Sequence, residues 1–317
     1  MATIDQVKNL VKAYADCDDE KFKTIILQIA AHEARVGHDN AARDLKRQVD
    51  QISGKKSNIL KMHKENAFFQ FTMPTFKKID LIVSKDLDIR INRVLMEYRN
   101  RKKLQSYGLA NRRKLLLEGV SGTGKTLSAS VIASELALPL YTVQMDKLVS
   151  KFMGETSIKL RQIFDVIASD EGVYFFDEFD AIGSDRNFDN EVGEMRRILN
   201  SFLQLIEQDN SNSIIIAATN NQKLLDKALF RRFDDVWHYD LPIEDEIKKL
   251  FEYKLVSFSS DFKVSKELIN QALGLSHAEI IRVCDDGIKN SILSNTPISE
   301  KEILSLLNER HIIYKEA

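Results

Sequence analysis

One eight-residue segment constrains the fold of this chain more than any other. Residues Gly119–Thr126 read Gly-Val-Ser-Gly-Thr-Gly-Lys-Thr, after the apolar run Lys114–Leu117 and before a helical pattern at Leu127–Leu136. Glycines in such a loop let backbone N–H groups surround phosphate oxygens, and the helix that follows adds the positive end of its dipole. The segment therefore predicts a phosphate-binding loop between a buried strand and a helix.

The side chains of this loop suggest which phosphates it binds. Lys125 would bring its ammonium group to the β- and γ-phosphates of ATP, and Thr126 would offer its hydroxyl to Mg²⁺. The other residues that we expect to contact the nucleotide from this loop are Gly119, Ser121, Gly122, Thr123, Gly124 and Leu127.

A second motif lies about fifty residues further on. The apolar run Val173–Phe176 ends in two carboxylates, Asp177 and Glu178, which is the form of a Walker B motif. Asp177 would complete the Mg²⁺ site, and Glu178 would orient and polarise the attacking water. A solvated turn is the alternative for an isolated Asp-Glu pair, but the four apolar residues before it and the phosphate loop upstream favour the catalytic interpretation.

A third polar strand end follows these two motifs. The apolar run Ile214–Ala218 ends in Thr219 and Asn220. An amide at the tip of a central strand can hydrogen-bond the same water beside the γ-phosphate, although Asn also ends strands as an ordinary turn residue. We expect Asn220 to be catalytic because it comes after the two stronger motifs.

The spacing of the apolar runs predicts the fold class. Runs at Lys114–Leu117, Leu140–Val143, Val173–Phe176 and Ile214–Ala217 alternate with helical patterns, as in βαβ units. This predicts an α/β fold with a parallel sheet covered by helices on both faces. The expected organisation is a helical N-terminal domain, a linker, the large α/β domain and a small helical domain, at residues 1–54, 55–74, 75–241 and 242–317. A prolonged solvated helix is the alternative for the basic part of the linker.

Composition limits the classes of partner and compartment. The 317 residues carry a net charge of −1, which does not suggest a nucleic-acid binder. Two cysteines far apart in sequence suggest neither a disulfide framework nor a zinc site. We find no apolar run that could span a bilayer and no apolar signal core at the N-terminus, so we expect a cytoplasmic protein.

Together these motifs resemble the AAA clade of the AAA+ ATPases, to which katanin, spastin and the proteasomal ATPases belong. The resemblance runs from about Phe76 to the C-terminal helices. Three segments carry it beyond the phosphate loop: Tyr174–Gly183 looks like the extended Walker B motif, Ala217–Asn220 like sensor 1, and Leu225–Asp234 like the second region of homology. The resemblance implies a P-loop AAA+ domain followed by a small helical lid domain.

The resemblance also assigns residues outside the two Walker motifs. It implies that Arg231 and Arg232 are arginine fingers, which act on the nucleotide of a neighbouring subunit in a ring, a hexamer by resemblance. A Lys stands at position 227 where the clade often has Pro, and a Gly that the clade often has in this loop is absent. In the sensor 2 region, His277 and Ala278 are implied to line the nucleotide pocket; a plain helix start is the alternative for His277.

One further segment suggests the use of the ATP energy. Phe152, Met153 and Gly154 resemble the aromatic–hydrophobic–Gly pore loop of AAA+ unfoldases, which can grip a polypeptide through apolar contact. The alternative is an aromatic ring packed beneath the loop. We therefore expect a ring-shaped motor for protein substrates, whose N-terminal domain binds a partner protease or adaptor. A nucleotide-switched scaffold and a nucleic-acid motor are the rival hypotheses.

Overall fold

The chain divides into two compact units, Met1–Ala67 and Phe68–Ala317. The computed structural model describes residues 8, 10, 19–35, 38, 41, 43–45, 47, 68–148, 155–179, 191–220 and 230–315. In the first unit, helix α2 (Asp19–Arg35) lies within residues 1–54, for which the sequence predicts helices, and it buries Ile25 and Ala30.

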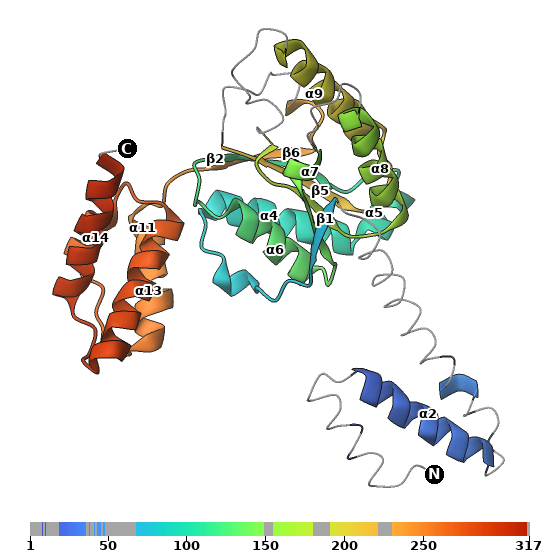
Figure 1. The fold of residues 1–317 in the computed structure, drawn as a ribbon, viewed down its shortest axis with the longest axis horizontal. Helices are drawn as coiled ribbons and strands as arrows, with labels where there is room; N and C mark the ends of the chain where they lie inside the picture. The colour runs from blue at the N-terminus through green and yellow to red at the C-terminus, as the bar shows by residue number, and fades with distance from the viewer. Residues whose placement is uncertain are drawn as a thin grey trace. The chain divides into compact units, whose positions relative to one another are not determined.

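The second unit contains a six-stranded sheet with the order β1-β3-β4-β5-β2-β6 (Figure 1). Strands β2 to β6 run parallel, and β1 pairs with β3 in antiparallel orientation and forms one edge of the sheet. The mixed α/β fold that the sequence predicts is confirmed. The strands are β1 (Phe69–Thr72), β2 (Lys114–Gly119), β3 (Leu140–Val143), β4 (Val173–Phe176), β5 (Ile214–Thr219) and β6 (Asp235–Tyr239).

Helices cover both faces of this sheet, as Figure 1 shows, with α4 and α6 on one side and α8 and α9 on the other. The helices of this part are α4 (Lys85–Arg99), α5 (Arg101–Ser106), α6 (Lys125–Glu135), α7 (Met145–Leu148), α8 (Glu155–Ser169) and α9 (Glu191–Gln208), with a short 3₁₀ turn at Lys78–Asp80.

Strand β2 shows why the two faces can both be apolar. Leu115 and Leu117 pack with α4 and α6, whereas Leu116 packs with α8 and α9, and all three are fully buried. Successive side chains of a strand point to opposite faces, so a continuous apolar run is what a parallel strand covered on both sides requires. The phosphate loop therefore starts from a rigid central strand.

Strand β1 lies within the range that the sequence assigns to the linker, residues 55–74. Phe69 and Phe71 pack against the sheet core, while Gln70 and Thr72 are exposed. This alternation is typical of an edge strand with one buried face. The sheet therefore begins before residue 75, because aromatic side chains at every second position can extend it by pairing with β3. Residues 55–67 lie outside the described part of the chain.

The C-terminal part is helical and has a hydrophobic core of its own. Its residues include Ile247, Phe251, Leu268, Val283 and Ile303, all fully buried. The elements are α11 (Glu244–Phe251), a π-helical turn at Glu252–Val256, α12 (Lys266–Ala272), α13 (His277–Ser294) and α14 (Glu300–Lys315). Among the described residues, no helix is long and apolar enough to cross a membrane.

Candidate functional site

The phosphate loop connects β2 to α6 and closes around the side chain of Lys125. The Lys125 ammonium group donates hydrogen bonds to the carbonyl oxygens of Gly119 and Val120, at 2.8 and 2.9 Å. The Thr123 hydroxyl donates to the Val120 carbonyl oxygen at 2.7 Å. Lys125 is only 6% exposed, so its side chain lies inside the loop and does not extend into solvent. These two carbonyl oxygens carry no net charge, and a charge-assisted hydrogen bond to a phosphate oxygen is stronger than one to a carbonyl oxygen.

Two glycines of the loop occupy places where no side chain fits. Gly119 has φ 148°, and a Cβ there would lie 2.0 Å from the carbonyl oxygen of Tyr239. Gly122 has φ 76°, and its Cβ would lie 2.6 Å from Oγ of Ser276. Both positions combine positive φ with close approach, so these two glycines are needed for shape as well as for access to phosphate.

The Walker B carboxylates lie beside the loop, at the end of β4. Oγ1 of Thr126 donates a hydrogen bond to Oδ2 of Asp177 at 2.9 Å, and Oδ1 of Asp177 accepts the N–H of Glu178 at 3.0 Å. Glu178 has φ 50° and an exposed side chain. A left-handed conformation is uncommon for Glu, and it directs this side chain away from the line of the strand.

The oxygens of Thr126 and Asp177 are of the kind that Mg²⁺ prefers. A hydroxyl and a carboxylate 2.9 Å apart supply two hard oxygen donors, and magnesium takes its other ligands from phosphate and water. The donor set therefore fits the Mg²⁺ ion that the sequence predicts. We assign Thr126 and Asp177 as the residues that would hold it.

A cleft of about 410 Å³ joins the loop, the two strand ends and the C-terminal helices. It brings together most of the residues that the sequence predicts to bind or hydrolyse nucleotide. The lining residues are Ser121, Gly122, Gly124, Lys125, Thr126, Leu127, Asp177, Glu178, Asn220, His277, Ala278 and Ile281.

His277 is the first residue of α13 and faces this cleft. It is 8% exposed, and neither ring nitrogen has a hydrogen-bond partner among the described residues. Burial lowers the pKa of His277 to about 4, so the ring is neutral near pH 7 and has one donor and one acceptor to offer. A buried polar group without a partner costs free energy, which a hydrogen-bonding ligand can recover.

The C-terminal helices contact the phosphate loop directly. The N–H of Ala278 donates to the carbonyl oxygen of Gly122 at 2.9 Å. On the other side of the loop, the hydroxyl of Tyr239 donates to Oγ of Ser128 at 2.7 Å, which ties β6 to the first turns of α6. The loop is thus supported both by the sheet and by the start of α13.

The two predicted arginine fingers lie apart from this cleft. They directly follow Phe230 and precede β6, whereas the phosphate loop follows β2. In the β2–β6 pair, Asp235 is level with Leu115 and Tyr239 is level with Gly119, so the arginines and the loop are at opposite ends of the sheet. Arg231 is exposed, and Nε of Arg232 lies 3.4 Å from Oε2 of Glu207 on α9.

Three groups of predicted residues lie outside the described part of the chain, and one of them is residues 180–183 of the extended Walker B segment. The pore-loop residues Phe152, Met153 and Gly154 lie outside the described residues, as do residues 225–229 of the second region of homology.

The structure also adds residues that the sequence analysis did not single out. Ile281 lines the cleft one helical turn after His277, and the i, i+4 spacing on α13 is the signal that could have found it. Glu118 is 3% exposed just before the phosphate loop and pairs with His238 across β2 and β6. The visible signal for this pair was an acidic residue between the apolar run Lys114–Leu117 and the phosphate loop.

The fold and the cleft define a class of protein. This protein has a mostly parallel sheet, a glycine-rich loop after the central strand β2, an acidic end on β4, one strand further along than β5, and helices over the loop. That is the architecture of a P-loop nucleoside triphosphatase.

Comparisons with known proteins specify the class further. The sequence model described as "ATPase family associated with various cellular activities (AAA)" matches residues 115–241. An AAA family ATPase of Sinorhizobium fredii, named as uncharacterised, is 34% identical over 303 residues, covering 92% of this chain and 90% of that protein. A 26S proteasome regulatory subunit homologue of Methanothermobacter marburgensis is 28% identical over 266 residues, covering 81% and 70%.

A third relative is the ATP-dependent zinc metalloprotease FtsH of Parabacteroides distasonis. It is 35% identical over 196 residues, which cover 59% of this chain and 29% of FtsH. The chain belongs to the AAA family of ATPases and is an ATP hydrolase.

Proposed function

We propose that this ATPase couples hydrolysis of Mg-ATP to unfolding, translocation or disassembly of protein substrates through the pore of a homo-oligomeric ring, by resemblance a hexamer. The observation that carries the catalytic part is the 2.9 Å hydrogen bond between Thr126 and Asp177, which brings the phosphate loop and the acidic strand end into one site. In this proposal a separate protease or an adaptor is the partner of the N-terminal domain.

Several residues of the cleft have distinct parts in nucleotide binding or hydrolysis. Lys125 and the loop N–H groups bind and orient the phosphates, and Glu178 accepts a proton from the attacking water while orienting it. Asn220 hydrogen-bonds the same water. His277 and Ala278 contact the nucleotide from α13. When bound, Mg²⁺ neutralises charge on the β- and γ-phosphate oxygens.

The location of the arginines supports action between subunits. Five residues of β6 separate Arg231 and Arg232 from the level of the phosphate loop. This is about 17 Å at the usual rise of a strand, more than an arginine side chain spans. If Arg231 or Arg232 stabilises a transferred phosphoryl group, that group therefore belongs to the nucleotide of a neighbouring copy, and a head-to-tail contact that closes produces a ring.

The choice of a protein substrate rests on relatives and on sequence. Two relatives are named for the proteasome and for a metalloprotease, and both names concern the breakdown of proteins. Phe152 and Met153 in the predicted pore loop suit contact with any polypeptide, since aromatic and thioether groups bind apolar surface without sequence preference.

Two substitutions test the proposal. Lys125→Ala should abolish ATP binding and hydrolysis, because the loop loses its cation, while Lys301→Ala on the exposed face of α14 should leave both unchanged. Phe152→Ala should retain ATP hydrolysis but lose the ATP-dependent unfolding of a tagged fluorescent protein substrate. Hydrolysis and unfolding would be measured on the same preparations.

The same assay separates the rival function. If the protein is a nucleotide-switched scaffold, partner binding should need ATP but not its hydrolysis, and the Phe152→Ala protein should behave as the parent does. Full unfolding activity in Phe152→Ala would contradict threading through a pore.

A further inference from the structure

The turn that carries Arg231 and Arg232 is bound to the strand that leads to the phosphate loop. Two residues after Arg232, the carboxylate of Asp234 accepts the backbone N–H groups of Arg113 and Lys114, both at Oδ2, at 2.8 and 2.9 Å. The N–H of Asp234 in turn donates to the carbonyl oxygen of Lys114 at 2.7 Å. Three hydrogen bonds therefore connect this one residue to Arg113, which directly precedes β2, and to Lys114, the first residue of β2.

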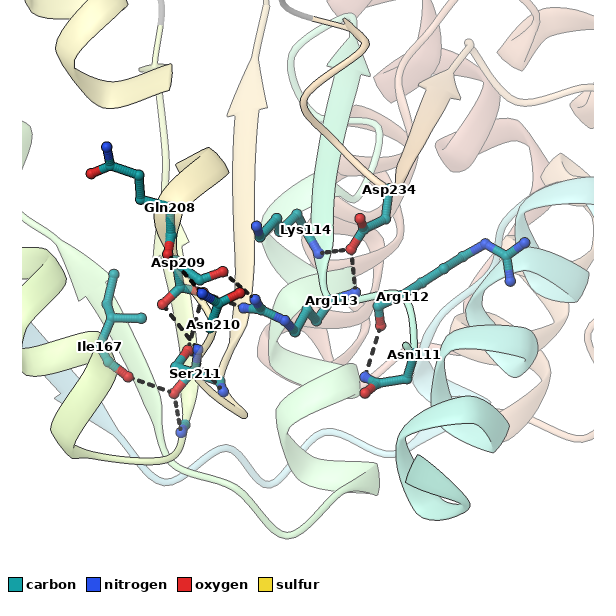
Figure 2. A network of polar contacts seen from close by, with 12 residues as sticks. Asn111, Arg112, Arg113, Lys114, Ile167, Gln208, Asp209, Asn210, Ser211 and Asp234 are labelled. Atoms are coloured by element: carbon teal, nitrogen blue, oxygen red, sulfur yellow. Dashed lines mark hydrogen bonds and ion pairs between the residues drawn. The ribbon is translucent and has the colours of Figure 1, made fainter. Parts of the chain in front are cut away.

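A buried ion pair also holds Arg113 in place, just before β2. The guanidinium of Arg113 contacts both the carboxylate and the carbonyl oxygen of Asp209, which directly follows α9 (Figure 2). Their side chains are 12% and 3% exposed. The hydroxyl of Ser211 donates to the same carboxylate at 3.2 Å, so Asp209 is held from two directions.

The arginines themselves differ in how they are restrained. Phe233 is buried in the sheet core and Phe230 packs against it, so both sides of the arginine pair are anchored. Arg232 pairs at 3.4 Å with Glu207, whose side chain is 65% exposed, and a solvent-exposed pair of this kind is weak. Arg231 is exposed. The backbone of the turn is therefore fixed, while its two guanidinium groups can bind a ligand with little loss of stabilising contacts.

We propose that Asp234, supported by the Arg113–Asp209 ion pair, is a positioning residue that holds the turn so that Arg231 is presented to the nucleotide of a neighbouring subunit. This inference rests on the proposed action of Arg231 between subunits. Asp234 belongs to one subunit but acts on hydrolysis in the next, because its own phosphate loop lies at the other end of β2.

Mixing subunits tests this directionality. Asp234→Ala alone should retain ATP affinity and lose hydrolysis by about 10- to 100-fold, the range expected when a catalytic group is displaced by about 1 Å. Lys125→Ala subunits hydrolyse nothing themselves but keep a correctly held Arg231. Adding them to Asp234→Ala subunits should restore hydrolysis, since the Asp234→Ala site is intact and the neighbour supplies the arginine.

The matched variants make the result decisive. Arg231→Ala subunits should be rescued by Lys125→Ala in the same way, but a mixture of Arg231→Ala with Asp234→Ala should stay inactive. Asp234→Asn keeps an amide oxygen that can accept both N–H groups, so it should retain most of the activity. Asp261→Ala removes an exposed aspartate of the C-terminal helical part and should behave as the parent protein.

Two outcomes would overturn the inference. Failure of Lys125→Ala to rescue Asp234→Ala, while it does rescue Arg231→Ala, would mean that Asp234 supports its own nucleotide site; the proposed action of Arg231 would survive. Full activity of Arg231→Ala alone would remove the arginine that Asp234 is said to position and would reject both ideas. Thermal unfolding of Asp234→Asn and Asp234→Ala shows whether each variant is folded before mixing.

Discussion

The two ends of the parallel sheet are built in opposite ways. At the carboxyl end, the phosphate loop has three glycines with positive φ, Glu178 is left-handed, and His277 is buried with no hydrogen-bond partner among the described residues. At the amino end, Arg113 forms an ion pair with Asp209, and its backbone N–H donates a hydrogen bond to Asp234, as Figure 2 shows.

This difference indicates a division of labour along the strands. Strained backbone and unsatisfied polar groups cost stability and are tolerated where a ligand or a reaction uses them. A network whose polar groups bond one another does not bind a ligand, but it holds in place the segments from which other residues project. Substitutions at the carboxyl end should therefore affect chemistry, and those at the amino end should affect stability or presentation.

The largest expected effect is on chemistry at the carboxyl end. If Glu178 is the general base, as proposed, Glu178→Gln should lower the hydrolysis rate by about 100- to 10,000-fold, while ATP binding persists. The free energy of unfolding should change little, since the side chain is exposed. Single-turnover hydrolysis, nucleotide binding and urea unfolding would be measured together, with Glu309→Gln as the exposed control. A large loss of stability in Glu178→Gln would break the comparison.

The next effect is on stability at the amino end. Arg113→Ala should lower the free energy of unfolding by about 3–5 kcal/mol, because Asp209 is left as a buried charge without its partner. Lys289→Ala removes one member of an exposed pair on α13 and should cost no more than about 0.5 kcal/mol. Denaturant titration of both variants gives the difference. If both variants lost the same free energy of unfolding, the Arg113–Asp209 pair would contribute no more to stability than an exposed ion pair does.

The smallest effect concerns pH and His277. Its folded-state pKa of about 4 lies below the ordinary value of 6.5. Between these values the unfolded chain binds a proton that the folded chain does not, so stability falls as the pH drops below 6.5, and above it the ring contributes nothing. Acidification from pH 7 to 5 should cost about 2 kcal/mol through His277.

The variant His277→Phe isolates this contribution. It should lose about 2 kcal/mol less stability than the parent protein between pH 7 and pH 5, and the two should run parallel between pH 7 and pH 8. Denaturant unfolding at each pH measures the difference. Identical pH profiles would show that the ring is protonated equally in both states.

The motifs that sequence could identify are those whose chemistry is local. The phosphate loop needs consecutive glycines and a following Lys-Thr pair, and the acidic strand end needs adjacent carboxylates after apolar residues. The sheet and its helical layers were also predictable, since a parallel strand buried on both faces must be apolar throughout. Strand β1 was assigned to a linker, because four residues that alternate are too short a pattern to distinguish an edge strand from an extended segment.

Contacts between distant segments were not predictable. Asp234 meets Arg113 across about 120 residues, and Asp209 meets it across 96, a separation at which no periodicity connects them. The carbonyl oxygen of Tyr239 requires a glycine at position 119, and the sequence around Tyr239 does not indicate this contact. These relations arise when strands align side by side, and the strand order is itself a tertiary outcome.

The sequence alone placed this chain among the ATP-hydrolysing proteins and predicted that Lys125 binds the phosphates, because the residues of that chemistry are neighbours in the chain. Only the tertiary structure decided that the arginine pair and the phosphate loop lie at opposite ends of the same strands. It also decided that the N–H of Ala278 on α13 donates a hydrogen bond to the carbonyl oxygen of Gly122. The physical reason is that side-chain chemistry is a property of short segments, whereas the distance between segments depends on which surfaces bury each other in the folded chain.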